Sequence, residues 1–159
     1  MTTHEQFMRR AIALSREGMA KGSGGPFGAV VVLDGEIVGE GHNRVLETND
    51  PTAHAEVVAI RNAAANLERF SLEGCVMYCI GLSCPMCMAS IFWSRIDKLY
   101  YVLPPEEAED IGFDDKYFFD ELAKPVEQRD FPVEAMPGLF DEAREVYQMW
   151  KTKSDRTPY

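Results

Sequence analysis

The spacing of apolar residues changes along the chain, and it predicts helices and strands in turn. Residues 5–20 place apolar side chains at intervals of three and four, which is typical of an amphipathic helix. Residues 27–33 are apolar and rich in valine, and residues 36–40 follow them after Asp34 and Gly35. Because an Asp-Gly pair readily adopts the positive φ angles of a tight turn, these two stretches predict a β-hairpin.

The middle of the chain predicts two further helices and two further strands. Asp50 followed by Pro51 is a typical helix start, with the aspartate as N-cap and the proline at the first helical position. Residues 75–80 form a short apolar run that indicates a buried strand, and residues 98–103 predict another. Between these strands a helix is expected directly after Ser83, its predicted N-cap. This order predicts a mixed sheet with helices on its faces.

Beyond residue 103 the pattern is less regular. Residues 106–110, 113–122 and 139–150 predict shorter helices, and a polar tail follows them. No internal repeat and no linker interrupts the sequence. A length of 159 residues suits one hydrophobic core, so a single domain is expected over the whole chain.

Charge and apolar content narrow the function. The chain carries 16 basic and 26 acidic residues, a net charge of −10, which disfavours a nucleic-acid partner. No apolar run approaches the roughly 18 residues that a membrane span requires. The N-terminal residues lack the apolar core of a secretory signal. We therefore expect a cytoplasmic protein, in which clustered cysteines indicate metal or redox chemistry more often than disulfides.

Three of the four cysteines fall within residues 79–87, CIGLSCPMC. Cys84 and Cys87 are three positions apart at a predicted helix start, so their thiols project to the same side. Together with His54 they offer three ligands for Zn²⁺ and leave a fourth position open for water, as in catalytic sites. Glu56, two residues after His54, is the expected proton shuttle. This His-x-Glu and Cys-x-x-Cys pattern is typical of zinc-dependent nucleobase deaminases.

Two other interpretations of the cysteines remain open at this point. Cys84 and Cys87 also resemble a redox pair that opens a helix after a strand, although this leaves the histidine and the glutamate without a role. A structural zinc site would need a fourth ligand, for which Cys79 is the nearest candidate. Alternation along the strand instead puts Cys75 and Cys79 on one face, where both are expected to pack as small buried apolar residues.

Beyond these motifs, the chain resembles the cytidine deaminase superfamily, and within it the bacterial guanine deaminases. The likeness is carried by PFGAVVVLDGEIVGEGHN (26–43), NDPTAHAEVVAIR (49–61), CPMCMASIFWSRI (84–96), FDDKYFFDELAKP (113–125) and a terminal tyrosine. This resemblance implies an α/β fold, a three-layer α/β/α sandwich around a five-stranded mixed sheet. It also implies homodimers, with a C-terminal segment of about residues 138–159 exchanged between subunits.

The resemblance assigns a role to each residue that matches a family motif. His54, Cys84 and Cys87 match the ligands of one zinc ion per chain, and Glu56 matches the proton shuttle. These are the four residues that the spacing of the motifs already singles out.

Five more residues match the family's substrate contacts. Asn43 corresponds to the asparagine that holds the ring edge, and Phe27 to the aromatic residue that stacks on the base. Asp115 corresponds to the carboxylate that binds guanine's ring N–H and amino groups. Tyr159 matches the terminal tyrosine that closes the pocket, and Trp93 an aromatic residue at the dimer interface.

The expected reaction is hydrolytic deamination of a purine-like base, above all guanine to xanthine with release of ammonia. Guanosine and the triazine ammeline are alternatives, and transfer-RNA adenosine is a more distant one. The non-enzymatic alternative is an inactive zinc-stabilised binding module, against which the presence of Glu56 argues. At residues 79–83 the chain reads CIGLS where relatives usually read threonine, serine, cysteine, glutamate and proline. This departure bears on substrate choice rather than on zinc binding.

Overall fold

The computed structural model describes residues 3–158, which divide into two compact units, one ending at Phe119 and one beginning at Asp120. The first unit contains α1 (Thr3–Ala20), β1 (Gly28–Leu33), β2 (Glu36–His42), α2 (Val45–Thr48), α3 (Ala55–Asn66), β3 (Val76–Gly81), α4 (Pro85–Trp93), β4 (Lys98–Leu103) and α5 (Pro105–Asp110). The bounds of α6 (Lys116–Ala123) cross the division, and the second unit contains η1 (Val126–Gln128), η2 (Pro137–Leu139) and α7 (Phe140–Thr152). A single domain over the whole chain stays a prediction.

The sheet of the first unit is mixed, with the strand order β2-β1-β3-β4. β1 pairs antiparallel with β2 and β3, and β3 pairs parallel with β4. The hairpin between β1 and β2 turns at Asp34 and Gly35, whose φ angles are 50° and 84°. These are the positive angles of a tight Asp-Gly turn, so the predicted hairpin is confirmed.

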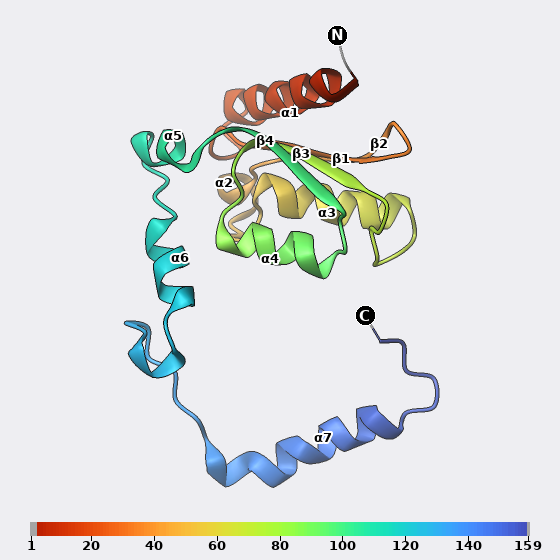
Figure 1. The fold of residues 1–159 in the computed structure, drawn as a ribbon, viewed down its shortest axis with the longest axis vertical. Coiled ribbons are helices and arrows are strands. Elements are labelled where there is room, and N and C mark those ends of the chain that lie inside the picture. Colours follow the sequence, from red (N-terminus) through yellow and green to blue (C-terminus); the bar gives the residue numbers. More distant parts are fainter. Residues whose placement is uncertain (1–2, 159) are drawn as a thin grey trace. The chain divides into compact units, whose positions relative to one another are not determined.

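Helices cover both faces of the sheet, so the first unit is a three-layer α/β/α sandwich (Figure 1). α1 lies on one face, where Leu14 packs with Val30 and Val32. α3 and α4 lie on the other face, where Val31 packs in the same cluster as Ala59. Because alternate residues of a strand point to opposite faces, β1 supplies both layers of the core.

Two glycines of β2 allow α3 to approach the sheet very closely. A Cβ atom added to Gly41 would come within 2.3 Å of the carbonyl oxygen of Ala55, and one added to Gly39 within 2.4 Å of that of Ala59. Both contacts are with backbone atoms, so no side-chain rotation can relieve them. This close approach holds the first turn of α3 against the end of β2.

Substitution of Gly41 by alanine is therefore expected to separate α3 from β2. We expect Gly41→Ala to lower the free energy of unfolding by about 3 kcal/mol, as overpacked cores do. Chemical denaturation measures this change. Gly138→Ala is the matched control, because a Cβ atom there meets no atom within 4 Å. Equal stability of the two variants would contradict the close contact.

The fifth strand predicted for the sheet is absent from residues 3–158, and this prediction is wrong. After β4 the chain forms α5 and α6. Residues 132–136, which begin with Pro132, have no regular structure. A strand persists only where a neighbouring strand accepts its backbone hydrogen bonds, and proline removes one donor. The sheet therefore has four strands.

The helix predicted to start at Asp50 begins later, at Ala55, with His54 as its N-cap. Asp50 instead accepts hydrogen bonds from the backbone N–H and the hydroxyl of Thr52, at 2.8 and 2.6 Å. Such a bond from an aspartate to the residue two positions on closes a local turn, which includes Pro51. Asp50 therefore caps a turn, and His54 precedes α3 instead of lying inside it.

The next helix, α4, has Cys84 as its N-cap instead of the predicted Ser83, and Pro85 opens it. The hydroxyl of Ser83 lies 3.7 Å from the sulfur of Cys79 and is buried. Ser83 therefore faces the interior instead of capping the helix. A further helix, α2, forms within a stretch for which the sequence predicts a loop.

The last helix exposes its apolar residues. α7 has no buried residue, and Val146, Tyr147, Met149 and Trp150 are all exposed. The three short helices predicted beyond residue 103 correspond to α5, α6 and α7 with shifted ends. None of the described helices combines the length and the apolar character needed to cross a bilayer.

Candidate active site

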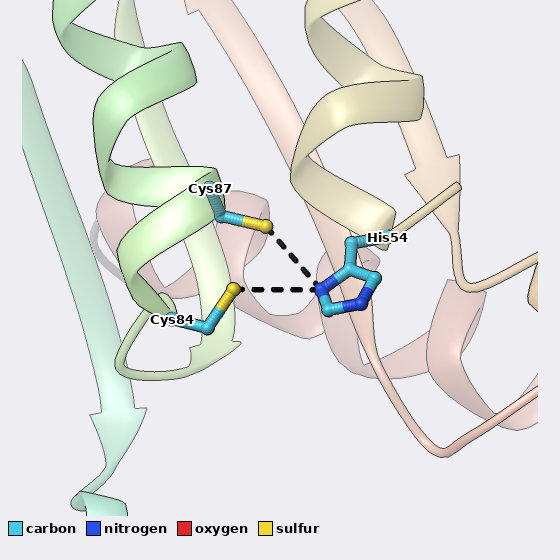
Figure 2. A group of neighbouring side chains, drawn as sticks. All are labelled: His54, Cys84 and Cys87. Carbon is cyan, nitrogen blue, oxygen red and sulfur yellow. Dashed lines mark hydrogen bonds between the residues drawn. The ribbon is translucent and has the colours of Figure 1, made fainter. Parts of the chain in front are cut away.

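The starts of α3 and α4 bring three candidate ligands together on one face of the sheet. His54 and Cys84 are the N-caps of these helices and have extended backbones, with ψ angles of 155° and 167°. Cys87 follows within the first turn of α4, and the two helices contact each other. Figure 2 shows the sulfur atoms of both cysteines directed at Nδ1 of His54.

The geometry of this group fits a tetrahedral zinc ion. The Sγ atoms of Cys84 and Cys87 lie 3.6 and 3.5 Å from Nδ1 of His54. With the usual Zn–S and Zn–N bond lengths, the S···N edge of a tetrahedron is about 3.6 Å. All three ligand atoms lie within 4.8 Å of one another. One imidazole and two thiolates are a donor set that zinc prefers.

A cavity of about 50 Å³ adjoins this group. It is lined by Phe27, Asn43, His54, Glu56, Gly81, Leu82, Cys84, Ala108, Phe113 and Asp115. The lining residues are spread along the chain, from Phe27, just before β1, to Asp115, just before α6. The elements that carry them meet at one end of the sheet. Three of the five predicted substrate contacts therefore lie around the same cavity as the predicted proton shuttle.

Comparison with known proteins identifies the family. A model of the cytidine and deoxycytidylate deaminase zinc-binding region matches residues 1–103, which include His54, Glu56, Cys84 and Cys87. The chain belongs to this deaminase family. It is therefore a zinc-dependent hydrolytic deaminase, with a His/Cys/Cys group that fits a single zinc site.

Individual relatives differ in how much of this deaminase they match. Guanine deaminase of Bacillus subtilis is 41% identical over 156 residues, which is 98% of this chain and 99% of that protein. The X-ray structure of guanine deaminase from Bacillus subtilis superimposes with a TM-score of 0.93 and covers 98% of both chains. A tRNA-specific adenosine deaminase of Aquifex aeolicus is 40% identical over 97 residues, which is 61% of this chain and 64% of that protein.

Hydrogen bonding shifts the pKa values of the two cysteines in the metal-binding group in opposite directions. The pKa of Cys84 falls to about 4, first through the hydrogen bond from Cys87 and then through that from His54, although burial opposes both. The pKa of Cys87 is raised, first by this hydrogen bond and then by burial. The bond with Cys84 also raises the pKa of His54. Because a metal binds deprotonated thiols, zinc would replace the shared proton.

Glu56 lies in the first turn of α3, and its side chain is buried. Burial raises the pKa of its carboxyl group, whereas hydrogen bonds from its own backbone N–H and from the Ser83 hydroxyl lower it. A hydrogen bond also links the carboxyl to Cys87. A carboxyl with a raised pKa beside the metal ligands is suited to accept a proton and to return it.

Asn43 and Asp115 present polar groups to the cavity. Asn43 is buried, and its Oδ1 atom accepts a hydrogen bond from the backbone N–H of Val45 at 3.1 Å. This bond leaves the amide nitrogen as the group that can donate to a ligand. Burial, and then the negative charge of Cys84, raises the pKa of Asp115. Besides Glu56, the cavity thus offers a neutral donor from Asn43 and a carboxyl group from Asp115.

The structure describes only one of the two remaining predicted substrate contacts. Trp93 is the last residue of α4, is 65% exposed and does not line the cavity. Tyr159 lies outside the described residues. Cys79 is not in the metal-binding group; it is buried in the core with Cys75, as alternation along the strand predicts.

Two residues that were not among the predicted site residues adjoin the site. Ser83 hydrogen bonds to Glu56, and Phe113 lines the cavity. Ser83 could have been noticed only as a departure from the family pattern. Phe113 opens the stretch FDDKYFFDELAKP that resembles the family, but only Asp115 of that stretch was assigned to the site.

Proposed function

We propose that the protein deaminates guanine to xanthine and releases ammonia. One observation carries this proposal. Asp115, from a segment after residue 103, lies in the cavity beside Glu56 and the metal ligands. The match to the zinc-binding region ends at residue 103, whereas the likeness to the Bacillus subtilis guanine deaminase covers 156 residues and so includes this segment. The 97 residues matched by the Aquifex aeolicus tRNA-specific adenosine deaminase span 61% of the chain.

The proposed chemistry uses Glu56 to move protons. Zinc held by His54, Cys84 and Cys87 would supply a Lewis acid that lowers the pKa of water towards neutrality. Glu56 accepts a proton from the attacking water and donates it to the ring nitrogen beside the amino-bearing carbon. It then transfers the second proton of the water to the leaving amine. Guanine and water thus yield xanthine and ammonia.

The other residues around the cavity orient the base. The ring of Phe27 offers a stacking face. Asn43 donates a hydrogen bond to an acceptor on the ring edge, and Asp115 accepts hydrogen bonds from the ring N–H and the amino group. A heterocycle without this donor pattern would leave buried polar groups unpaired, which is the usual source of strong selectivity.

Ammonia release from a substrate panel tests the proposed function. The panel contains guanine, guanosine, ammeline, adenine, cytosine and a transfer-RNA anticodon stem, and zinc content is measured on the same preparations. We expect the highest kcat/KM on guanine, with one zinc per chain. Preference for any other member would reject guanine as the substrate, and zinc-loaded protein without ammonia release from any of them would favour the inactive binding module.

Removal of the Asp115 carboxylate is expected to reduce selectivity. Asp115→Ala should lower kcat/KM on guanine by about 10- to 100-fold, the value of a charge-assisted hydrogen bond. The loss of kcat/KM on 2-aminopurine should be smaller, because this base has the amino group but lacks the N–H of the six-membered ring. Asp114→Ala is the control, because that carboxylate accepts from the backbone N–H of Lys116 and does not line the cavity. Equal losses on both substrates would remove Asp115 from recognition.

We also propose a cytoplasmic homodimer in which the C-terminal segment, about residues 138–159, is exchanged between subunits. Two features support this proposal: α7 buries none of its apolar residues, and Trp93 is exposed at the end of α4. The four free cysteines suit a reducing compartment. Light scattering should give twice the chain mass of 17.9 kDa. A truncation before residue 138 that stays dimeric would reject the exchange.

A further inference from the structure

Phe113 forms part of the wall of the cavity and is held there by the backbone. The N–H groups of Gly112 and Phe113 donate hydrogen bonds to the carbonyl oxygens of Glu109 and Ala108, each at 2.9 Å. Gly112 has a φ angle of 93°, which an L side chain rarely adopts, so glycine makes this turn possible. Phe113 is thus placed by the end of α5.

The ring of Phe113 packs directly on Phe27. The two ring centroids are 4.9 Å apart, and the rings are perpendicular. A Cβ atom on Gly25 would come within 2.7 Å of Cζ of Phe113, so glycine leaves the space that this ring occupies. Phe113 lines the cavity and is 41% exposed, so it stands where the cavity meets solvent. It therefore forms an outer wall.

The chemistry determines which end of a substrate approaches this wall. The amino-bearing carbon must face the metal ligands and Glu56. In guanine that carbon belongs to the six-membered ring, and the five-membered ring extends away from it. A base that stacks on Phe27 therefore directs its five-membered ring, which carries ribose in a nucleoside, away from His54.

We propose that Phe113 is a specificity-determining residue that admits free bases and excludes their nucleosides. A ribosyl group would have to occupy the space of the Phe113 ring. The backbone bonds of Gly112 and Phe113 oppose a shift of the turn, and the contact with Phe27 opposes a rotation of the side chain. This inference rests on the proposed function in one respect, namely that a purine base occupies the cavity.

The test compares nucleoside with base in the wild type and in Phe113→Ala. The ratio of kcat/KM on guanosine to that on guanine should rise by about 10- to 100-fold in the variant, in line with the selectivity of apolar pockets. Phe113→Leu should give an intermediate ratio. Phe119→Ala is the matched control, because Phe119 is 42% exposed, lies on the same segment and does not line the cavity. A general structural defect would lower both rates without changing their ratio.

Two outcomes would overturn the inference: a wild type that deaminates guanosine as fast as guanine, or a ratio that Phe113→Ala leaves unchanged. If the wild type releases no ammonia from guanine, the proposed function fails instead. In that case the ratio of kcat/KM on nucleoside to kcat/KM on base is measured for the base that the wild type does deaminate and for its nucleoside. Calorimetry on Glu56→Gln gives a second measurement without turnover: the base should bind, and the nucleoside should bind only when Phe113→Ala is added. If neither the base nor the nucleoside binds to Glu56→Gln, with or without Phe113→Ala, both proposals are rejected.

Discussion

Glu56→Gln is expected to lower the rate of ammonia release by about 10²- to 10⁴-fold, the usual contribution of a general acid–base group. Glutamine has nearly the same shape as glutamate but cannot accept and return a proton. Because Glu56 is separate from the metal-binding group of His54, Cys84 and Cys87, the variant should retain one zinc per chain. Steady-state kinetics and zinc analysis on one preparation measure both quantities.

The exposed Glu36, at the start of β2, provides the control for this change. Glu36→Gln also removes one negative charge, but from a residue with no proposed catalytic role. It should leave the rate of ammonia release unchanged. Wild-type rates in Glu56→Gln would show that another group transfers the proton. Loss of zinc from this variant would instead mean that Glu56 helps to hold the metal.

Cys87→Ala is expected to abolish both zinc binding and turnover. The change leaves Cys84 and His54 as the only protein ligands of the group, and two ligands do not hold zinc tightly in a site built for three. After dialysis, zinc content should fall from one per chain to near zero, and ammonia release should fall to the background rate. The melting temperature should fall as well, because bound metal stabilises the folded state.

Cys75→Ala is the matched control, since Cys75 is also a fully buried cysteine but packs in the core away from the metal-binding group. It should lose some stability and keep its zinc and its activity. If Cys87→Ala retained stoichiometric zinc, Cys87 would not be a ligand, and the tetrahedral geometry inferred from the S···N distances would be wrong.

Local sequence patterns predicted the elements that depend on local chemistry. The hairpin follows from Asp34 and Gly35, whose preferred angles match the turn that forms. The strand at residues 98–103 was predicted with the bounds that the structure has. The convergence of His54, Cys84 and Cys87 was also predictable, because both halves of the motif stand at helix starts that the same sheet brings together.

Features that depend on which of several possible contacts the folded chain makes were not predictable in this way. Aspartate is a residue type that often caps a helix, but the hydrogen bonds of Asp50 with Thr52 close a turn before the helix begins. A fifth strand would have to pair with one of the outer strands, β2 or β4, and no further strand of the described chain does so. Phe113 packs against Phe27, which stands far earlier in the sequence, so its place at the cavity depends on a long-range contact as well as on its own turn.

The cavity draws on two parts of the chain that can change separately. The metal ligands and Glu56 all precede residue 103, whereas Phe113 and Asp115 follow it on the turn between α5 and α6. If Asp115 and Phe113 act as proposed, mutations in this turn should alter which heterocycle is accepted without changing the metal-binding group or Glu56. Exchange of residues 104–119 between relatives would create new substrate preferences on an unchanged catalytic centre.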